Sequence, residues 1–212
     1  MKQGNMRATD EIESPAQSSF SGKFRRPKNK DVRSREFLTE DEVDRLMKAA
    51  VNVGRHGHRD RTMILMAFRH ALRVSELVSL KWQQIDLKQG QIHVTRLKGG
   101  VDSTHPLRGV ELRALRRLQR DYESSLQYVF VSERAAPLTP SAFRKILARA
   151  GEKAKLGFPT HPHMLRHACG YYLANQGIDT RAIQGYLGHA NIMHSSRYTE
   201  LAPNRFEGFW GD

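Results

Sequence analysis

The chain has 212 residues and a formal net charge of +13, from 35 Lys and Arg against 22 Asp and Glu, and 39% of its residues are hydrophobic. This length and composition can bury the core of one sizeable domain, which excludes a wholly disordered or collagen-like protein. The excess of basic residues favours a polyanionic partner, either nucleic acid or an acidic membrane surface.

Cysteine content and hydropathy narrow the class of protein further. The single cysteine, Cys169, excludes a disulfide framework and a cysteine-rich zinc site. The chain has neither an apolar signal segment near its start nor a run of the roughly 18 apolar residues that a membrane span needs. We therefore expect a soluble, cytoplasmic protein that does not bind membranes.

Residues 1–35 differ from the rest of the chain, because Ser, Pro, Gln, Asn and charged residues dominate them, and we expect a flexible arm. The second half of the arm is strongly basic. It could order on DNA and follow the phosphates, or it could be a solvated run of charge. Its cations are Lys23, Arg25, Arg26, Lys28, Lys30, Arg33 and Arg35.

The ordered part of the chain is predicted to begin with helices. Thr39 and Glu42 have the spacing of a capping box before an amphipathic segment, and a second apolar stripe with helical spacing covers residues 58–69. The segment LRVSELVSLKW continues the helical periodicity, and Arg73 lies near its start.

From Gln84 the pattern changes to an alternation of apolar and polar residues, which is typical of strands. Gly90 and the pair Gly99–Gly100 mark two turns, so we expect a small antiparallel meander with Lys98 at its second turn. Helices are expected again in VELRALRRL and in a segment that starts at Thr139. The apolar run YVFV between them fits either type of element.

The segment PTHPHMLRHACGYYLANQG is predicted to be a helix, because Pro162 and Gly177 stand where proline and glycine commonly begin and end one. At 100° per residue, His163 and His167 lie nearly opposite the apolar face and Arg166 lies on its flank, so His163 and Arg166 should project together from the core. The residues predicted to face the core are Leu165, Ala168, Cys169, Tyr172 and Leu173.

Two short helices are predicted to complete the chain. Asp179 is a candidate N-cap of a helix that ends at Gly188, and Asn191 is a candidate start of a helix that carries Tyr198. The expected fold class is therefore mainly α with a small antiparallel β-sheet.

Several polar residues near the ends of these elements could act on a phosphodiester. Two arginines can bind one phosphate through their planar forks of donors and offset transition-state charge, while a lysine and a histidine can transfer protons. A tyrosine in a cationic pocket could be the nucleophile, or it could simply pack its ring in the core. The candidates are Arg73, Lys98, His163, Arg166, His189 and Tyr198.

Each candidate also has a simpler interpretation. Arg73 could form an ion pair with Glu76 three residues later, and Lys98 could be a solvated turn residue beside two glycines. His163 and His167, four residues apart, could be metal ligands, although their predicted helix contains no Asp or Glu and the chain has no second cysteine. Spacing alone does not decide between these alternatives.

The order of the motifs resembles that of the tyrosine recombinase, or phage integrase, family from about residue 36 to the end. The matching motifs are ALRVSEL with Arg73, RLKGG with Lys98, HMLR with His163 and Arg166, and LGHANIMHSSRY with His189 and Tyr198. The amino-acid sequence around these motifs is most similar to that of the fimbrial phase-variation invertases. The resemblance implies the catalytic-domain fold of DNA breaking-rejoining enzymes.

The resemblance also implies an enzyme, a site-specific recombinase in which Tyr198 attacks a DNA phosphate and forms a 3′-phosphotyrosine with a free 5′-hydroxyl. One phosphodiester is exchanged for another, so neither ATP nor a metal cofactor is implied. The other implied roles are phosphate binding by Arg73 and Arg166, protonation of the leaving oxygen by Lys98, acid–base catalysis by His163 and a phosphate hydrogen bond from His189.

The domain organisation departs from that of most family members, which have a separate core-binding domain. We expect residues 23–35 of the arm to supply part of that grip on DNA, and residues 36–212 to form the catalytic domain. The tail from about residue 199 could dock on a neighbouring protomer or close the core of its own. Its aromatic residues are Phe206, Phe209 and Trp210.

The partners implied by the resemblance are double-stranded DNA at specific recombination sites and three further copies of the chain. The copies would form a synaptic tetramer that passes through a Holliday junction, with a monomer as one option off DNA. The resemblance also implies a location in the bacterial cytoplasm, in association with the nucleoid. Accessory DNA-bending proteins are further candidate partners.

Two other functions compete with this one. A non-catalytic DNA-binding regulator on the same fold would not need a nucleophile, and a metal-dependent nuclease would be sensitive to chelators. Inversion, excision and integration share one chemistry, so inversion rests on the subfamily resemblance alone.

Overall fold

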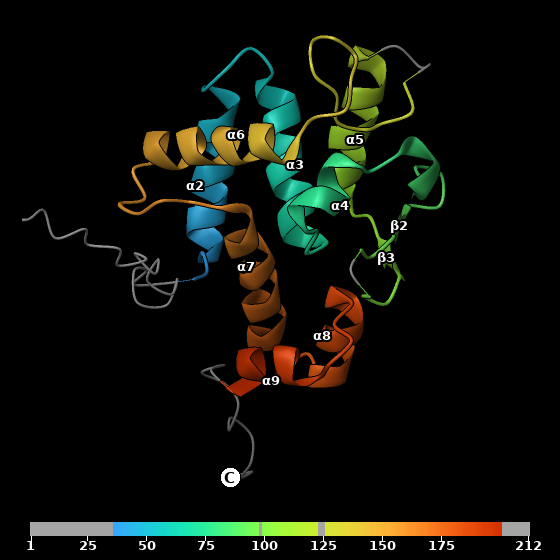
Figure 1. Ribbon diagram of the computed structural model, residues 1–212, viewed down its shortest axis with the longest axis vertical. Helices are drawn as coiled ribbons and strands as arrows, with labels where there is room; N and C mark the ends of the chain where they lie inside the picture. The colour runs from blue at the N-terminus through green and yellow to red at the C-terminus, as the bar shows by residue number, and fades with distance from the viewer. Residues whose placement is uncertain (1–35, 98, 123–125, 201–212) are drawn as a thin grey trace, which may run out of the picture. The chain divides into compact units, whose positions relative to one another are not determined.

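The computed structural model describes residues 36–97, 99–122 and 126–200. They form a mainly helical domain with one small antiparallel sheet, which confirms the expected fold class (Figure 1). No helix within these ranges is long and apolar enough to cross a membrane. The helices are α2 (Glu40–Val51), α3 (Gly57–Arg69), α4 (Val74–Val78), α5 (Gly109–Asp121), α6 (Pro140–Lys153), α7 (Pro162–Asn175), α8 (Thr180–Leu187) and α9 (Met193–Glu200), with a 3₁₀ turn at Trp82–Gln84.

Side-chain caps set the predicted starts of the helices. Thr39 and Glu42 form the reciprocal capping box of α2, and the Thr139 hydroxyl accepts a hydrogen bond from the Ala142 amide at the start of α6. The Asp179 carboxylate accepts from two backbone amides at the start of α8. These caps confirm the predicted helix starts.

The sheet is the predicted meander, with strand order β1 (Ile85–Asp86), β2 (Gln91–Val94) and β3 (Ser103–Pro106) and antiparallel pairing throughout. Gly90 has the positive φ of 67° that the first turn requires. The YVFV run contributes only isolated bridges at its two ends, through Tyr128 and Val131. Its backbone therefore bypasses the sheet.

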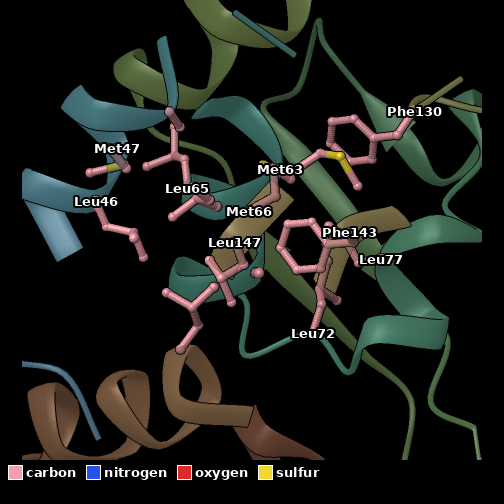
Figure 2. Close-up of a cluster of buried hydrophobic side chains, with 14 of the residues drawn as sticks. Leu46, Met47, Met63, Leu65, Met66, Leu72, Leu77, Phe130, Phe143 and Leu147 are labelled. Carbon is pink, nitrogen blue, oxygen red and sulfur yellow. The ribbon is translucent and has the colours of Figure 1, made fainter. Parts of the chain in front are cut away.

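The main core lies where α3 contacts α2, α5 and α7, and α6 packs against α2 and contributes Phe143, Leu147 and Ala150 to it (Figure 1). Figure 2 shows Leu72, Leu77 and Phe143 grouped together, so the segment that enters α4 is held against α6. This packing matters for function because it fixes the backbone on both sides of Arg73.

Helix α7 is buried on two sides, which corrects the prediction that Arg166 and His167 project away from the core. Arg166 is 1% exposed and His167 is 3% exposed, whereas Tyr172, predicted to face inward, is 37% exposed. Helices α8 and α9 fold back onto α7 and build a second cluster there. Helical periodicity within one segment cannot reveal a face that later segments cover. The second cluster contains Ala71, Cys169, Ala174, Ile183, Leu187 and Tyr198.

Replacing Leu147 by alanine should lower the free energy of unfolding by about 2–5 kcal/mol, because this fully buried side chain would leave a cavity in the main core. Ile146 is its neighbour on α6 and is only half-buried, so Ile146→Ala is the matched control, with an expected loss of about 1 kcal/mol or less. Urea unfolding of both variants measures the difference. Equal losses would contradict this packing of α6.

Candidate active site

Arg73 is placed by the turn between α3 and α4. Ala71 in this turn has a φ of 49°, a left-handed conformation that is uncommon for residues other than glycine. The Arg73 side chain donates from Nη1 to Glu76 Oε1 at 2.8 Å and to the Leu97 carbonyl at 3.2 Å. The ion pair with Glu76 that the sequence allowed is therefore present, and the same guanidinium also reaches the end of the hairpin.

Glu76 is a buried carboxylate that is held by several donors. Burial by itself would raise the pKa of Glu76, but hydrogen bonds from the Arg73 amide and side chain and the charge of Arg96 outweigh it and lower that pKa. The carboxylate therefore stays ionised in the interior, where it orients both arginines.

Arg166 projects from α7 between the ends of α3 and α8. Its Nη1 donates to the Ala71 carbonyl and its Nη2 donates to the Leu187 carbonyl, each at 2.6 Å. Burial, together with the charges of Arg73 and Arg96, lowers its pKa to about 10, so the guanidinium remains charged at neutral pH. A guanidinium has five N–H donors, so the two bonds fix its orientation without exhausting it.

His189 follows Gly188, whose φ of 65° ends α8. The ring is held by a 2.8 Å contact between Nδ1 and the hydroxyl of Ser195. Burial and the nearby charges, Arg166 foremost and Arg73 among the others, lower the pKa of His189 to about 3. These charges act on His189 because the end of α8, the Arg73 turn and α7 meet at one place.

Tyr198, on α9, is fully buried. Its hydroxyl lies 2.9 Å from His167 Nδ1 and 3.3 Å from Arg197 Nη2. A Cβ at Gly170 would come within 2.7 Å of the Tyr198 ring, so this glycine permits the close contact between α7 and the ring. Burial raises the pKa of Tyr198, and the hydrogen bond and charge of Arg197 oppose that rise.

His167 is the direct partner of the tyrosine. Burial, followed by the charges of its neighbours, lowers the pKa of His167 to about 3, so the ring is neutral at neutral pH. Arg197 Nη2, which can only donate, lies 3.0 Å from Nδ1 of this ring. The Tyr198 hydroxyl shares Nδ1 with this arginine, whose Nη2 also lies 3.4 Å from Nε2 and 3.3 Å from the hydroxyl itself.

His163 lies one turn before His167 on α7 and is exposed. The two rings meet edge to face with centroids 4.2 Å apart. Partial desolvation and the charges of Arg166 and Arg197 lower the pKa of His163. His163 therefore contacts the ring of His167, whereas the hydroxyl of Tyr198 contacts His167 and not His163.

The structure therefore gathers five of the six predicted catalytic residues around the ends of α3, α7 and α8. Lys98 lies outside the described residues, as do all seven predicted cations of the arm and the aromatic residues of the tail. Among the residues that the structure describes, no group of three or more His, Cys, Asp or Glu side chains could hold a metal ion.

Sequence reasoning did not assign a role to Arg96, His167 or Arg197 in this site. Arg96 carried a recognisable pattern, because the alternation of β2 continues past Val94 and places it on the buried face. A charged residue at an inward position needs a buried partner, which here is Glu76. The roles of His167 and Arg197 depend on the return of α9 to α7, and no local pattern indicates that contact.

Three buried histidines should make the protein sensitive to acid. His105, His167 and His189 have pKa values of about 3 in the folded chain, mainly through burial, against an ordinary value of 6.5. Unfolding then takes up protons as the pH falls below 6.5, so the free energy of unfolding should fall by up to about 1.4 kcal/mol per pH unit for each histidine.

Urea unfolding between pH 7 and pH 5 measures this slope, and His105→Gln should reduce it by the contribution of one histidine. The same slope in the variant and the wild type would show that His105 does not exclude a proton in the folded state. At pH 7 His105 is mainly neutral in both the folded and the unfolded state. The urea midpoint at pH 7 is therefore the reference from which the change in each protein is measured.

Comparison with known proteins gives one consistent result. Residues 36–205 match the model of the phage integrase family. The type 1 fimbriae regulatory proteins FimB and FimE of Escherichia coli strain K12 are each 44% identical to the chain. The match covers 86% of this chain and 94% of FimB, and 83% of this chain and 91% of FimE.

Solved structures agree with the sequence comparison. The crystal structure of XerA recombinase superimposes with a TM-score of 0.69 at 29% identity, covering 80% of this chain and 62% of that one. The XerH recombinase bound to difH gives a TM-score of 0.66 at 21% identity over 78% of this chain and 50% of that one, and shows the shared fold. The chain belongs to the phage integrase family, and its fold is that of a tyrosine recombinase catalytic domain.

Proposed function

We propose that this protein is a site-specific recombinase that cuts and rejoins double-stranded DNA through a phosphotyrosine formed on Tyr198. One observation carries the proposal. In a chain of this family, the tyrosine, two arginines and two histidines expected from the motif order lie around the same three helix ends. They are Arg73, His163, Arg166, His189 and Tyr198.

In the proposed reaction the Tyr198 oxygen forms a bond to the scissile phosphorus, and the bond from phosphorus to the 5′ oxygen breaks. The phenol proton leaves to a neighbouring histidine and the 5′ oxygen takes a proton, for which Lys98 is the proposed donor. Arg73 and Arg166 are proposed to bind the nonbridging oxygens, because two fixed guanidinium forks match the charge that develops there. The reverse reaction joins a new strand, so no external energy is consumed.

The histidines are proposed to divide the remaining work. Neutral His167 contacts the Tyr198 hydroxyl through Nδ1, so with that nitrogen unprotonated it can orient the phenol and take up its proton. His163 is exposed beside it and is proposed to pass that proton to or from solvent. His189, oriented by Ser195, is proposed to donate to the phosphate.

The buried tyrosine supports the idea that this conformation is a resting state. Tyr198 and Arg166 are almost inaccessible to solvent, and a DNA phosphate cannot contact a group that protein atoms cover. We propose that DNA binding displaces α9, and that this movement breaks the contact between Tyr198 and His167. Assembly into a synaptic tetramer on DNA would couple this opening to the presence of partners.

The rearrangement that we propose is inversion of a DNA segment. Its support is the resemblance of the motifs to those of the fimbrial phase-variation invertases, together with the similarity to the type 1 fimbriae regulatory proteins FimB and FimE over nearly their whole length. The excess of positive charge supports a duplex DNA partner, because phosphates along a duplex bind cations whatever the sequence.

Trapping the covalent intermediate tests the reaction. Labelled duplexes that tile the DNA on both sides of the protein's own gene are nicked at random, so that a short 5′-hydroxyl fragment is lost after cleavage near a nick. Wild-type protein should form a protein–DNA adduct that survives a denaturing gel, and Tyr198→Phe should form none.

Tyr172→Phe is the matched control, since Tyr172 is an exposed tyrosine on α7 and should leave adduct formation intact. Binding without any adduct across all duplexes would instead favour a non-catalytic DNA-binding regulator. Cleavage that leaves no adduct and that a chelator abolishes would favour a metal-dependent nuclease.

We also propose that the arm of residues 1–35 holds DNA beside the catalytic domain. Deleting it should weaken DNA affinity and flatten the dependence of log K on log salt, by about 0.9 for each phosphate that the arm neutralises. Deleting only residues 1–22, which removes none of the seven clustered cations, is the control and should leave the slope near the wild-type value. An unchanged slope after the longer deletion would show that the arm does not contact DNA.

A further inference from the structure

Arg96 is a buried arginine at the site, paired with Glu76, and no step of the proposed reaction uses it. It lies just beyond β2, and its side chain is 0% exposed. Its hydrogen-bond partners come from the ends of α3 and α8 and from Glu76 on α4, so Arg96 stays covered when α9 moves. We propose that Arg96 is a positioning residue that holds Arg73, Arg166 and the turn of His189 in one arrangement for phosphate binding. This inference rests on the proposed function, since it assigns a task to Arg96 within that reaction.

The first connection runs to Arg73 through a shared carboxylate. Arg96 Nη1 donates to Glu76 Oε2 at 3.0 Å, while Arg73 Nη1 donates to Glu76 Oε1 at 2.8 Å. The Leu97 amide also donates to Oε1, at 3.2 Å. Displacing Arg96 would therefore remove one of the two donors to Oε2 of the carboxylate that orients Arg73, the other being the Arg73 amide.

The second connection runs to Arg166 through a shared carbonyl. The Ala71 oxygen accepts from Arg166 Nη1 at 2.6 Å and from Arg96 Nη1 at 3.1 Å. Arg96 Nη2 also donates to the preceding carbonyl, that of His70, at 3.1 Å. Two adjacent carbonyls at the end of α3 are thus oriented by one guanidinium, in a turn that contains the left-handed Ala71.

The third connection runs to the turn that carries His189. The last four carbonyls of a helix lack partners within it. At the end of α8 the His189 amide donates to the Gln184 carbonyl, and the Gly188 amide donates to the Gly185 carbonyl. The remaining two, Tyr186 and Leu187, accept from Arg96 Nη2 and Arg166 Nη2, each at 2.6 Å.

Only an arginine can make this set of bonds. The four acceptors of Arg96 are two carbonyls from α3's end, one from α8 and a carboxylate, and they lie around a planar fork. A lysine would keep a positive charge beside Glu76 but would place one compact donor group where two are needed. The space is also limited, because a Cβ at Gly188 would come within 2.7 Å of Arg96 Cγ.

Arg96→Lys tests the proposal, with Arg59→Lys as the matched control. Arg59 is also a buried arginine, bonded to Asp60 and to the Val131 carbonyl, and it lies near the start of α3. At 1.5 Å per residue this places it roughly 16 Å along the helix axis from the carbonyls that Arg96 binds. Both substitutions replace a buried planar guanidinium by an ammonium group, but only Arg96→Lys does so at the site.

The measurements are the dissociation constant for the DNA on which wild-type protein forms the covalent adduct, and the single-turnover cleavage rate at saturating DNA. We expect Arg96→Lys to lower the cleavage rate about 100-fold, because small displacements of binding groups have effects of this size. Its dissociation constant should change less than about threefold, and Arg59→Lys should change either quantity by less than about threefold. A structural role alone would not separate cleavage from binding in this way.

A second pair of variants covers the case in which Arg96→Lys does not fold. A Cβ at Gly100 would come within 2.8 Å of both Arg96 Cβ and the Gly188 carbonyl and 3.4 Å from Arg73 Nη1, so Gly100→Ala forces apart the groups that Arg96 holds together and retains every buried charge. Its control is Gly185→Ala on α8, where a Cβ would meet no atom within 4 Å. Gly100→Ala should slow cleavage at saturating DNA by at least about 10-fold, and Gly185→Ala should not.

The outcomes distinguish the role of Arg96 from the reaction itself. If wild-type protein forms no adduct, the proposed function fails, and the role of Arg96 fails with it. If wild-type protein cleaves and the Arg96→Lys rate falls no further than the Arg59→Lys rate, only the role of Arg96 is overturned. The same holds if folded Gly100→Ala cleaves like the wild type.

Discussion

The site depends on one constraint, which is that the carbonyl groups at the ends of α3 and α8 must find donors in the interior of the protein. A buried carbonyl without a partner costs free energy comparable to that of a lost hydrogen bond. Arg96 and Arg166 provide the donors for both helix ends, at His70, Ala71, Tyr186 and Leu187. The same interaction thus ends two helices and places two guanidinium groups side by side.

Burying two positive charges requires negative charge nearby, and Glu76 supplies it. The carboxylate is nearly inaccessible and is bonded to both Arg73 and Arg96. Burial, followed by the charges of Arg73 and Arg96, lowers the pKa of Arg166 to about 10, which still leaves the guanidinium charged at neutral pH. The positive charges of Arg73, Arg96 and Arg166 lie close together around the carboxylate of Glu76. A further anion would stabilise this arrangement, and a DNA phosphate would provide one.

Tyr198, the proposed nucleophile, is covered by the same packing that organises the site. Tyr198 completes the second cluster with Ile183 and Leu187, and its hydroxyl is satisfied by His167. Contacts that stabilise a closed conformation must be broken before the hydroxyl can reach a phosphate, so stability and reactivity are opposed at this residue. Helix α9 has eight residues and packs against α7 and α8, so its movement leaves the main core intact.

The sequence by itself determined the elements and the identity of the motifs. Caps at Thr39, Thr139 and Asp179 are local hydrogen bonds between neighbouring residues, and strand alternation is a local periodicity, so both are visible without a tertiary structure. The order of Arg73, His163, Arg166, His189 and Tyr198 likewise indicated the family that the comparisons identify.

Only the tertiary structure decided what these residues contact. Arg166 and His167 look exposed on a helical projection, yet α8 and α9 cover them, because burial of a second helix face depends on segments that follow in the chain. The partner of Tyr198 is thirty-one residues away at His167, and the acceptors of Arg96 come from α3, α4 and α8. Such contacts are set by the path of the whole chain, and no periodicity within one segment contains that information.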